Sequence, residues 1–314
     1  MATVIGIPFA DATTNKDLLK EGSLRTIFDN TVHDANKFSE KFYNMENTNL
    51  WIETDFRMAG FDLAPEIAEG QNIPIQKPQA GTTKSYTQRI WGTGFRMTKW
   101  MNEANKYKLW SRWAKSLGEI MTETKDIELA VPFNSPTSTT LTCGTGFDSL
   151  AVGYDTHTGL NPNTTSDNYD NYINAALSYT SLDSARYYFA MKENDMGLHM
   201  GMSPDTLYFE PTQYFTAVEL TQSTNRPFEF SNTTNKPIQS MGLELYEYKR
   251  LTSTTAWGMA ALKDKNHDFN CFTFQAPQTY TKDAPDHTLD RVMIAVQAFT
   301  YGWGHPATIL IGKT

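Results

Sequence analysis

Residues that could do chemistry are present in the sequence, but their spacing does not complete a known site. Asp264, Asn266 and Asp268 match the opening of a calcium-binding loop. The loop is not completed, because Phe269 replaces the glycine of its sixth position and Gln275 replaces the glutamate of its twelfth. We therefore expect no calcium site here.

Other catalytic patterns are also incomplete. The Gly-Thr-Gly steps that begin at Gly92 and Gly144 lack the third glycine of a nucleotide-binding loop, so they are interpreted as turns. The six histidines show no metal-binding spacing, and no G-x-S-x-G motif is present. Cys143 and Cys271 stand far apart without a CxxC or mixed Cys/His pattern. The sequence thus predicts no enzyme, no metal site and no cofactor.

One group of cations is a candidate for binding phosphate. Lys108, Arg112 and Lys115 fall at helical spacing, so a helix would place them on one face. A charged helix face is most often only solvated, and that interpretation stays open. The formal charge of -8, from 27 Lys+Arg against 35 Asp+Glu, argues against a dedicated nucleic-acid-binding protein. Any contact with DNA is expected to be local.

The composition predicts a folded chain. Its 314 residues suffice for one elaborate domain or two compact ones, and 39% hydrophobic residues suffice for a core. The two cysteines are expected to be free thiols in a reducing compartment. No segment reaches the roughly 18 consecutive apolar residues of a membrane span. Folding in a cytoplasm without export is the simplest expectation.

Two strand-like stretches flank a long segment rich in proline and glycine. Residues 50–58 and 84–91 alternate with the period of a strand, which predicts an antiparallel pair. The segment between them far exceeds the roughly two to five residues of an ordinary hairpin loop. It should not form a core of its own, so we expect a protruding loop whose partner is another copy of the chain.

Helices are predicted at three places downstream. Over residues 99–121, apolar residues recur at spacings of three, four or seven and define one buried face. Trp100 and Trp110 on this stripe are interpreted as core or subunit-interface residues. Shorter helices are expected over residues 172–195 and directly after Pro211.

The remaining segments complete an α+β pattern. Residues 1–49 are expected to form an extended arm with short helices. Strands are predicted over residues 206–210, 243–250, 256–262, 268–274 and 291–301. The last of these is apolar on both faces, which is typical of a central strand. It is followed by the stretch Trp303-Gly-His-Pro306.

This order of elements resembles the major capsid protein of tailed bacteriophages with the Hong Kong 97 type of fold. The resemblance covers essentially the whole chain and implies an α+β fold in five parts. These are an N-terminal arm (1–49), an extended loop (50–92), a peripheral domain with a long spine helix (93–144), an axial domain (145–282) and the return strand of the peripheral domain (283–314).

The resemblance implies a structural protein that assembles as hexamers and pentamers into an icosahedral shell around double-stranded phage DNA. The implied partners are a portal protein, a separate scaffolding protein, a decoration protein and, non-specifically, the packaged DNA, with no membrane contact. The implied location is the virion capsid, after assembly in the cytoplasm of the host bacterium.

The resemblance also assigns residues. Lys108, Arg112 and Lys115 are expected to face the lumen and the DNA. Some members of the family cross-link a loop lysine to an asparagine of a neighbour, and Lys77 and Lys84 lie in the corresponding region. An intersubunit clasp is expected to use residues of the extended loop: Pro65, Glu66, Gly70, Pro74, Lys77, Pro78 and Lys84.

Two alternatives remain open at this point. An encapsulin-like nanocompartment shell has the same fold and encloses enzymes instead of DNA. A carbohydrate-binding or carbohydrate-active protein would use the aromatic residues, which form 13% of the chain, as stacking surfaces.

Overall fold

The structure is a computed structural model of the chain. It describes residues 21–58, 60–61, 63–77, 80–98, 100, 107–158, 167–224, 238, 240–283 and 290–314. The chain divides into two compact units. The first comprises Met1–Lys37, Arg89–Lys125 and Gln275–Phe299, and the second comprises Phe38–Gln88, Asp126–Phe274 and Thr300–Thr314.

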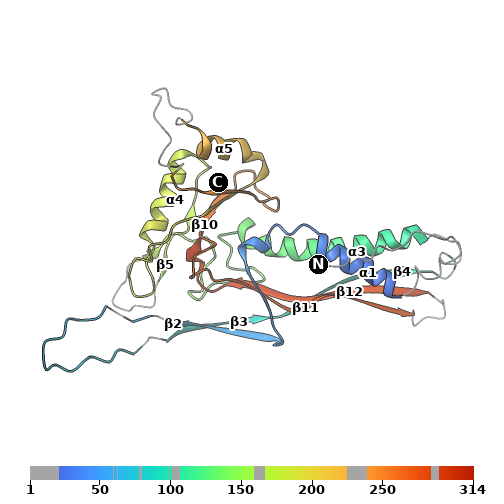
Figure 1. Cartoon of the computed structure of the whole chain (residues 1–314), viewed down its shortest axis with the longest axis horizontal. Helices are drawn as coiled ribbons and strands as arrows, with labels where there is room; N and C mark the ends of the chain where they lie inside the picture. Colours follow the sequence, from blue (N-terminus) through green and yellow to red (C-terminus); the bar gives the residue numbers. More distant parts are fainter. Residues whose placement is uncertain are drawn as a thin grey trace, which may run out of the picture. The chain divides into compact units, whose positions relative to one another are not determined.

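The first unit packs helices on one face of a sheet. Strand β4 (Arg89–Met97) pairs antiparallel with β12 (Arg291–Trp303), and the register runs from Arg89 opposite Phe299 to Met97 opposite Arg291. Helices α1 (Glu21–Asp34) and α3 (Tyr107–Asn134) supply the other side of the core (Figure 1). The buried residues of this cluster are Leu24, Phe28, Met97, Trp110, Ala114, Leu117, Met121, Met293 and Ala295.

Helix α3 confirms the apolar stripe predicted around Trp110, but the predicted end is wrong. The helix continues to Asn134 and includes Pro132 in its last turn. Apolar residues keep the helical spacing beyond the predicted end, because Leu129, Ala130 and Phe133 are also buried. Trp100, in contrast, is 77% exposed.

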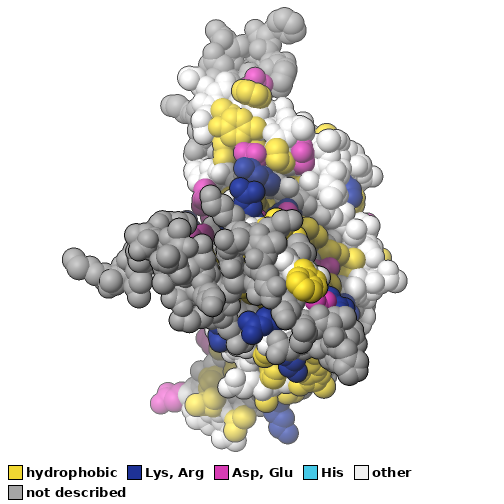
Figure 2. Space-filling view, turned by 90° about the vertical axis from the view of Figure 1, so that its right-hand side faces the viewer, with side chains coloured by type: hydrophobic (Ala, Val, Ile, Leu, Met, Phe, Trp, Pro, Cys, Tyr) yellow, Lys and Arg dark blue, Asp and Glu magenta, His cyan; other side chains and the backbone are white. Residues whose placement is uncertain are grey.

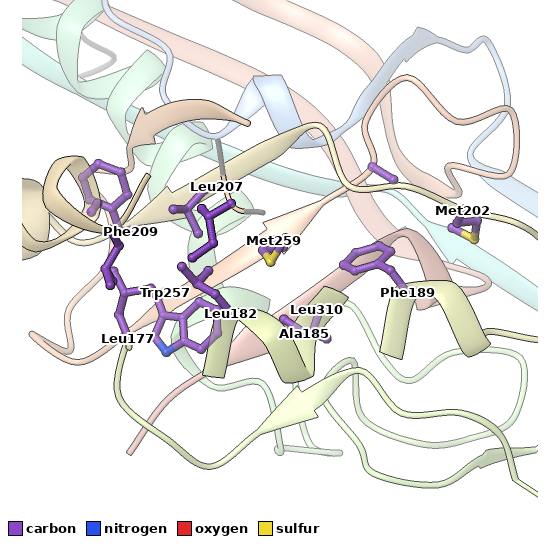
Figure 3. Packing of buried hydrophobic residues seen from close by; sticks show 14 of the residues in the cluster. Leu177, Leu182, Ala185, Phe189, Met202, Leu207, Phe209, Trp257, Met259 and Leu310 are labelled. Atoms are coloured by element: carbon purple, nitrogen blue, oxygen red, sulfur yellow. The ribbon is translucent and has the colours of Figure 1, made fainter. Parts of the chain in front are cut away.

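The second unit is built on a five-stranded sheet with helices against it. Helix α4 (Tyr179–Met191) places Leu182, Ala185 and Phe189 on the side facing Trp257 and Leu310 of the sheet (Figure 3). Helix α5 (Tyr214–Gln222) follows the short 3-10 helix η2 (Pro211–Gln213), so Pro211 opens a helical segment as predicted. The sheet order is β7 (Tyr172–Ile173), β13 (Ile309–Gly312), β10 (Trp257–Ala260), β8 (Thr206–Phe209) and β9 (Glu244–Glu247).

The predicted helix over residues 172–195 begins too early. Residues Tyr172–Ile173 form β7, and the helix starts only after Ser178. The Ser178 side chain accepts a hydrogen bond from the Ser181 amide, and the Ser181 hydroxyl accepts one from the Ser178 amide. This capping box fixes the start of the helix at Tyr179.

The longest strands belong to a four-stranded sheet. Its order is β1 (Asn44–Asn47), β11 (Phe269–Asp283), β12 and β4, with β1 parallel to β11. Strand β12 therefore lies inside the sheet, which confirms the prediction of a central strand. Its two faces differ, however, because Met293 and Ala295 are buried while Ile294 is 38% exposed.

The segment expected to be an N-terminal arm makes more internal contacts than the sequence suggested. Leu24 and Phe28 lie one helical turn apart on α1 and enter the core of the first unit. Phe42, in the 3-10 helix η1 (Glu40–Phe42), is fully buried in the second unit. Residues 1–20 lie outside the described part of the chain.

Candidate intersubunit surface

The hairpin formed by β2 (Ile52–Met58) and β3 (Ala80–Thr87) has reversed polarity: apolar side chains lie on its exposed face and charged side chains on its buried face. The outer face carries Ile52, Phe56 and Met58, which are 51%, 65% and 68% exposed. Thr54 lies between them, and the paired positions on β3 are Thr83, Ser85 and Thr87. A strand normally buries its apolar face and exposes its polar face. The exposed apolar outer face thus indicates a surface that meets another molecule.

The inner face of the same hairpin is charged and turned toward the rest of the second unit, to which the hairpin belongs. It carries Glu53, Asp55 and Arg57 on β2 and Lys84 and Tyr86 on β3. Arg57 and Lys84 are 6% and 9% exposed, so both cations are buried within the chain. The hairpin is therefore held to its own chain by polar contacts, while its apolar side chains stay free.

The segment between the two strands extends the exposed apolar surface. Residues 60–77 have no helix or strand in their described parts, and they continue past the ends of β2 and β3 (Figure 1). A turn at Gly70, with φ of 86°, reverses the chain, and the Gln71 amide donates to the Ala68 carbonyl at 3.1 Å. The exposed large apolar side chains of this loop are Phe61 (62%), Leu63 (70%), Ile67 (42%), Ile73 (75%) and Ile75 (92%).

The two legs of the loop also form a shallow hollow. It has a volume of about 290 Å³ and apolar walls that include Phe61, Ile67, Ile73 and Pro74. The Gln76 side-chain amide reaches across to the Leu63 carbonyl at 3.5 Å. A hollow of this size admits an apolar side chain of a partner.

The structure brings most of the predicted clasp residues together on this loop. Pro65, Glu66, Gly70, Pro74 and Lys77 are all exposed there. Pro78 lies outside the described residues. The prediction missed the apolar side chains beside them. The alternation of Phe61 with Leu63 and of Ile73 with Ile75 was the available signal, since it places apolar residues on one side of an extended segment.

Lys84 needs a correction, because its side chain is not available to a neighbour. Its ammonium donates to the Trp303 carbonyl at 2.7 Å and lies 4.9 Å from the ring centres of Tyr86 and of Trp303. Burial lowers the pKa of Lys84 to about 8. Lys84 is thus a contact within the chain, whereas Lys77 stays exposed on the loop.

The predicted basic face of α3 is only partly basic. Arg112 and Lys115 are exposed, while the side chain of Lys108 lies outside the described residues. Lys115 lies 3.8 Å from Glu119, one turn further along the helix. Glu123 continues the same face. On the face drawn in Figure 2, Lys and Arg side chains are scattered among hydrophobic and acidic ones.

The other residue groups considered in the sequence have structural roles. The Asp264 carboxylate accepts from the Asn266 amide at 2.8 Å and shapes a turn, and Asp268 accepts from the His305 amide at 2.8 Å. The part of the chain that the structure describes contains no group of three or more His, Cys, Asp or Glu able to hold a metal. Within that same part, no helix has the length and apolarity to cross a membrane. Trp110, Trp257 and Trp303 are buried and offer no stacking surface to a sugar.

A family model described as phage capsid protein matches residues 81–311. The chain belongs to this family. As a phage capsid protein it is a structural protein of the virion capsid and not an enzyme, as the sequence predicted. The surfaces of interest are therefore those that meet other copies of the chain.

Solved structures agree with this assignment at the level of the fold. The capsid protein is similar to the mature capsid of bacteriophage PhiM1, with 11% identity, a TM-score of 0.58 and coverage of 88% of this chain and 87% of that one. The capsid of cyanophage P-SCSP1u gives 11% identity, a TM-score of 0.57 and coverage of 89% and 88%. A virus-like particle from Pyrococcus furiosus gives 9% identity, a TM-score of 0.54 and coverage of 93% and 98%.

These likenesses confirm the α+β, Hong Kong 97-like fold of this capsid protein. Among curated proteins, no sequence matches the chain.

Proposed function

We propose that this capsid protein assembles with copies of itself, as hexamers and pentamers, into an icosahedral shell that encloses double-stranded phage DNA. The observation that carries the proposal is the reversed polarity of the β2–β3 hairpin. Its outer face and the loop beyond it expose apolar side chains, Ile75 at 92%, that no described segment of the chain covers. Burial of such surface favours association by about 25 cal/mol per Å².

In this proposal the outer face and the loop act as a clasp on the adjacent copy. The apolar side chains of the loop supply most of the buried area, and Pro65 and Pro74 limit the conformations of the free loop. That restriction lowers the entropy lost on binding. Glu66 and Lys77 are exposed on the same loop and would fix register through charge. A closed shell requires heterologous contacts of this kind.

The five-part division of the chain belongs to the same proposal. The arm (1–49), the extended loop (50–92), the peripheral domain (93–144 and 283–314) and the axial domain (145–282) are assigned by the family resemblance. The same holds for assembly in the host cytoplasm and for contacts with portal, scaffolding and decoration proteins. Arg112 and Lys115, with Lys108, are proposed to face the lumen and offset repulsion between DNA and an acidic protein.

A cargo shell of the encapsulin kind is the competing function. The likeness to the particle from Pyrococcus furiosus is compatible with it, because a fold does not determine what a shell encloses. The phage capsid family match over residues 81–311 favours DNA as the content. Nuclease-protected DNA inside purified particles would support the phage function, and enclosed protein without DNA would contradict it.

The clasp is tested by deleting residues 66–79 and by the double substitution Ile73→Ser/Ile75→Ser. Both variants are expected to stay folded and to form no stable shells, measured by circular dichroism and negative-stain microscopy. Gln71→Ser/Asn72→Ser changes exposed polar residues of the same loop and serves as the matched control. Normal shells from the deletion would rule out the clasp.

A further inference from the structure

Two buried cations attach the hairpin to the rest of its unit, one at Trp303 near the C-terminus and one at Asp195 after α4. Lys84 donates to the Trp303 carbonyl at 2.7 Å. Arg57 binds Asp195, and Asp195 lies 3.4 Å from His305 Nε2. Strand β3 thus bonds the stretch Trp303–His305 directly, whereas β2 is linked to it through Asp195. These residues belong to the same compact unit.

The contact between Arg57 and Asp195 is a two-pronged ion pair. The Arg57 Nε lies 3.2 Å and 3.1 Å from the two carboxylate oxygens of Asp195, and an Nη2 hydrogen bond to Oδ1 completes it. The two side chains are only 6% and 9% exposed. A two-pronged pair fixes the angle between its partners as well as their distance. It therefore constrains the direction of β2 where the strand passes into the loop.

The partner of Arg57 is itself held rigidly. Asp195 lies in a tight turn after α4, and the Asn194 side chain accepts from the amides of Met196 and Leu198 at 2.9 Å and 3.0 Å. Gly197, with φ of 78°, completes this turn. Because the backbone of this turn is fixed, Asp195 also fixes the position of the Arg57 side chain that binds it.

His305 is fixed in a similar way from the other side. Its Nδ1 lies 2.6 Å from the Tyr169 hydroxyl, and its backbone amide donates to Asp268 at 2.8 Å. Tyr169 stacks on the buried ring of His157, which in turn bonds Asp148 at 2.5 Å. Asp195 is thus the point where a rigid polar network of the core meets the hairpin.

Among the described contacts, a hydrogen bond from the Thr82 hydroxyl to the Phe147 carbonyl at 2.6 Å also holds the end of the hairpin. The outer face is exposed, and a cavity of about 270 Å³ lies beside the ion pair. Phe56, Met58, Phe147 and Met200 line its apolar part. The cavity leaves room for the hairpin end to tilt about the Thr82 contact once the ion pair is absent.

We propose that Arg57, Asp195 and His305 are positioning residues that set the direction of the hairpin and so aim the clasp at the adjacent copy. The inference rests on the proposed clasp function and adds that contacts within the chain set the direction of the clasp. Buried ion pairs contribute little net stability compared with apolar packing, but they require one geometry. These three residues, called the latch below, therefore fix an orientation of the hairpin that an apolar contact would leave variable.

Hydrogen exchange of the purified full-length protein tests the proposal, with mass spectrometry reading β2 and β3 separately from β8 and β10. Arg57→Met and Asp195→Asn are expected to raise exchange of the hairpin amides by about tenfold or more while β8 and β10 keep their protection. Arg57→Lys keeps the charge and should restore part of the protection. Arg250→Met removes a comparable ion pair with Asp126, at 2.7 Å in the same unit, and should leave the hairpin unchanged.

Equal loss of protection in hairpin and core, or none in the hairpin, would overturn the latch. The natural chain and the variants are compared as unassembled subunits, separated from shells by size, so this outcome is independent of whether shells form. Microscopy of the same variants then tests the link to the clasp. Folded Arg57→Met protein with a loosened hairpin is expected to give few or irregular shells, and regular shells from it would refute the positioning role. Should Arg57→Met fail to fold, His305→Gln weakens the same network more mildly.

Discussion

The buried ammonium group of Lys192 donates a hydrogen bond to the backbone carbonyl of Ala307. The lysine lies at the end of α4, where its ammonium group also sits 4.1 Å from the centre of the Phe189 ring. Burial lowers the pKa of Lys192 to about 7. The side chain thus joins α4 to the C-terminal strand region without a carboxylate hydrogen-bonded to it among the described contacts.

Lys192 makes stability depend on pH. Its pKa is lower in the folded chain than the ordinary value of 10.5, so above pH 7 the unfolded chain binds more protons. The free energy of unfolding should therefore rise with pH above 7, by about 1 kcal/mol per pH unit. Chemical denaturation between pH 7 and 9 measures this slope, to which Lys84, with a pKa of about 8, contributes in the same range, so the difference between the natural chain and a Lys192 variant isolates Lys192. Lys192→Met should flatten it, and an unchanged slope would contradict the assignment.

Asp195 gives a dependence of the same sign at acid pH, since its pKa is also lowered in the folded chain. Burial alone would raise its pKa, but hydrogen bonds from His305 and Arg57 outweigh burial and lower the pKa to about 2. The contribution of the latch is complete above the ordinary value of 3.8 and is lost as the pH falls through 2. Exchange of the β2 and β3 amides should increase in this window before the core opens. The Asp195→Asn variant should show fast hairpin exchange at every pH.

Gly304 is predicted to tolerate no side chain. A Cβ at this position would lie 2.1 Å from an Asp268 oxygen and 2.3 Å from the Phe147 ring. Gly304→Ala should lower the free energy of unfolding by roughly 1 to 3 kcal/mol, as overpacking does in other cores. Gly60→Ala is the control, because a Cβ there meets nothing within 4 Å. Equal thermal stability of the two variants would show that the Trp303–His305 stretch adapts more easily than its geometry indicates.

The exposed cations of α3 are predicted to matter for packaged DNA and not for the fold. Arg112→Glu/Lys115→Glu, and the triple variant that adds Lys108→Glu, should assemble and retain less nuclease-protected DNA per particle. Lys263→Glu/Lys265→Glu reverses two other exposed charges and is the matched control. Unchanged assembly and DNA retention in the α3 variants would remove the lumen-facing assignment.

Local periodicity predicted much of the fold. The alternation in residues 50–58 and 84–91 anticipated the β2–β3 pair, but the second strand was placed too late, since β3 ends at Thr87 and residues 89–91 belong to β4. The stripe around Trp110 anticipated the buried face of α3. The alternation did not tell which face of the hairpin turns inward. That choice depends on the pair Arg57–Asp195, whose members are 138 positions apart, and on the carbonyl that binds Lys84, 219 positions away.

The same limit explains the errors at element ends. The sequence around Ser178 contains the capping box, but the strand pairing that consumes Tyr172–Ile173 involves Ile311 and Gly312 at the far end of the chain. Phe61, Leu63, Ile73 and Ile75 were overlooked for a different reason. An apolar residue in a loop gains meaning only once the structure shows that it is exposed and that no described part of the same chain covers it.

The reversed hairpin places two selective pressures on opposite sides of one pair of strands. Substitutions on the inner face are tested each time a single chain folds, whereas substitutions on the outer face are tested only when copies meet. Under the proposed clasp function, the outer face is free to diverge in step with the surface that it contacts on the adjacent copy. A lineage whose outer face has diverged would still fold, yet its subunits would be rejected by shells of the ancestral type when both are made in one cell.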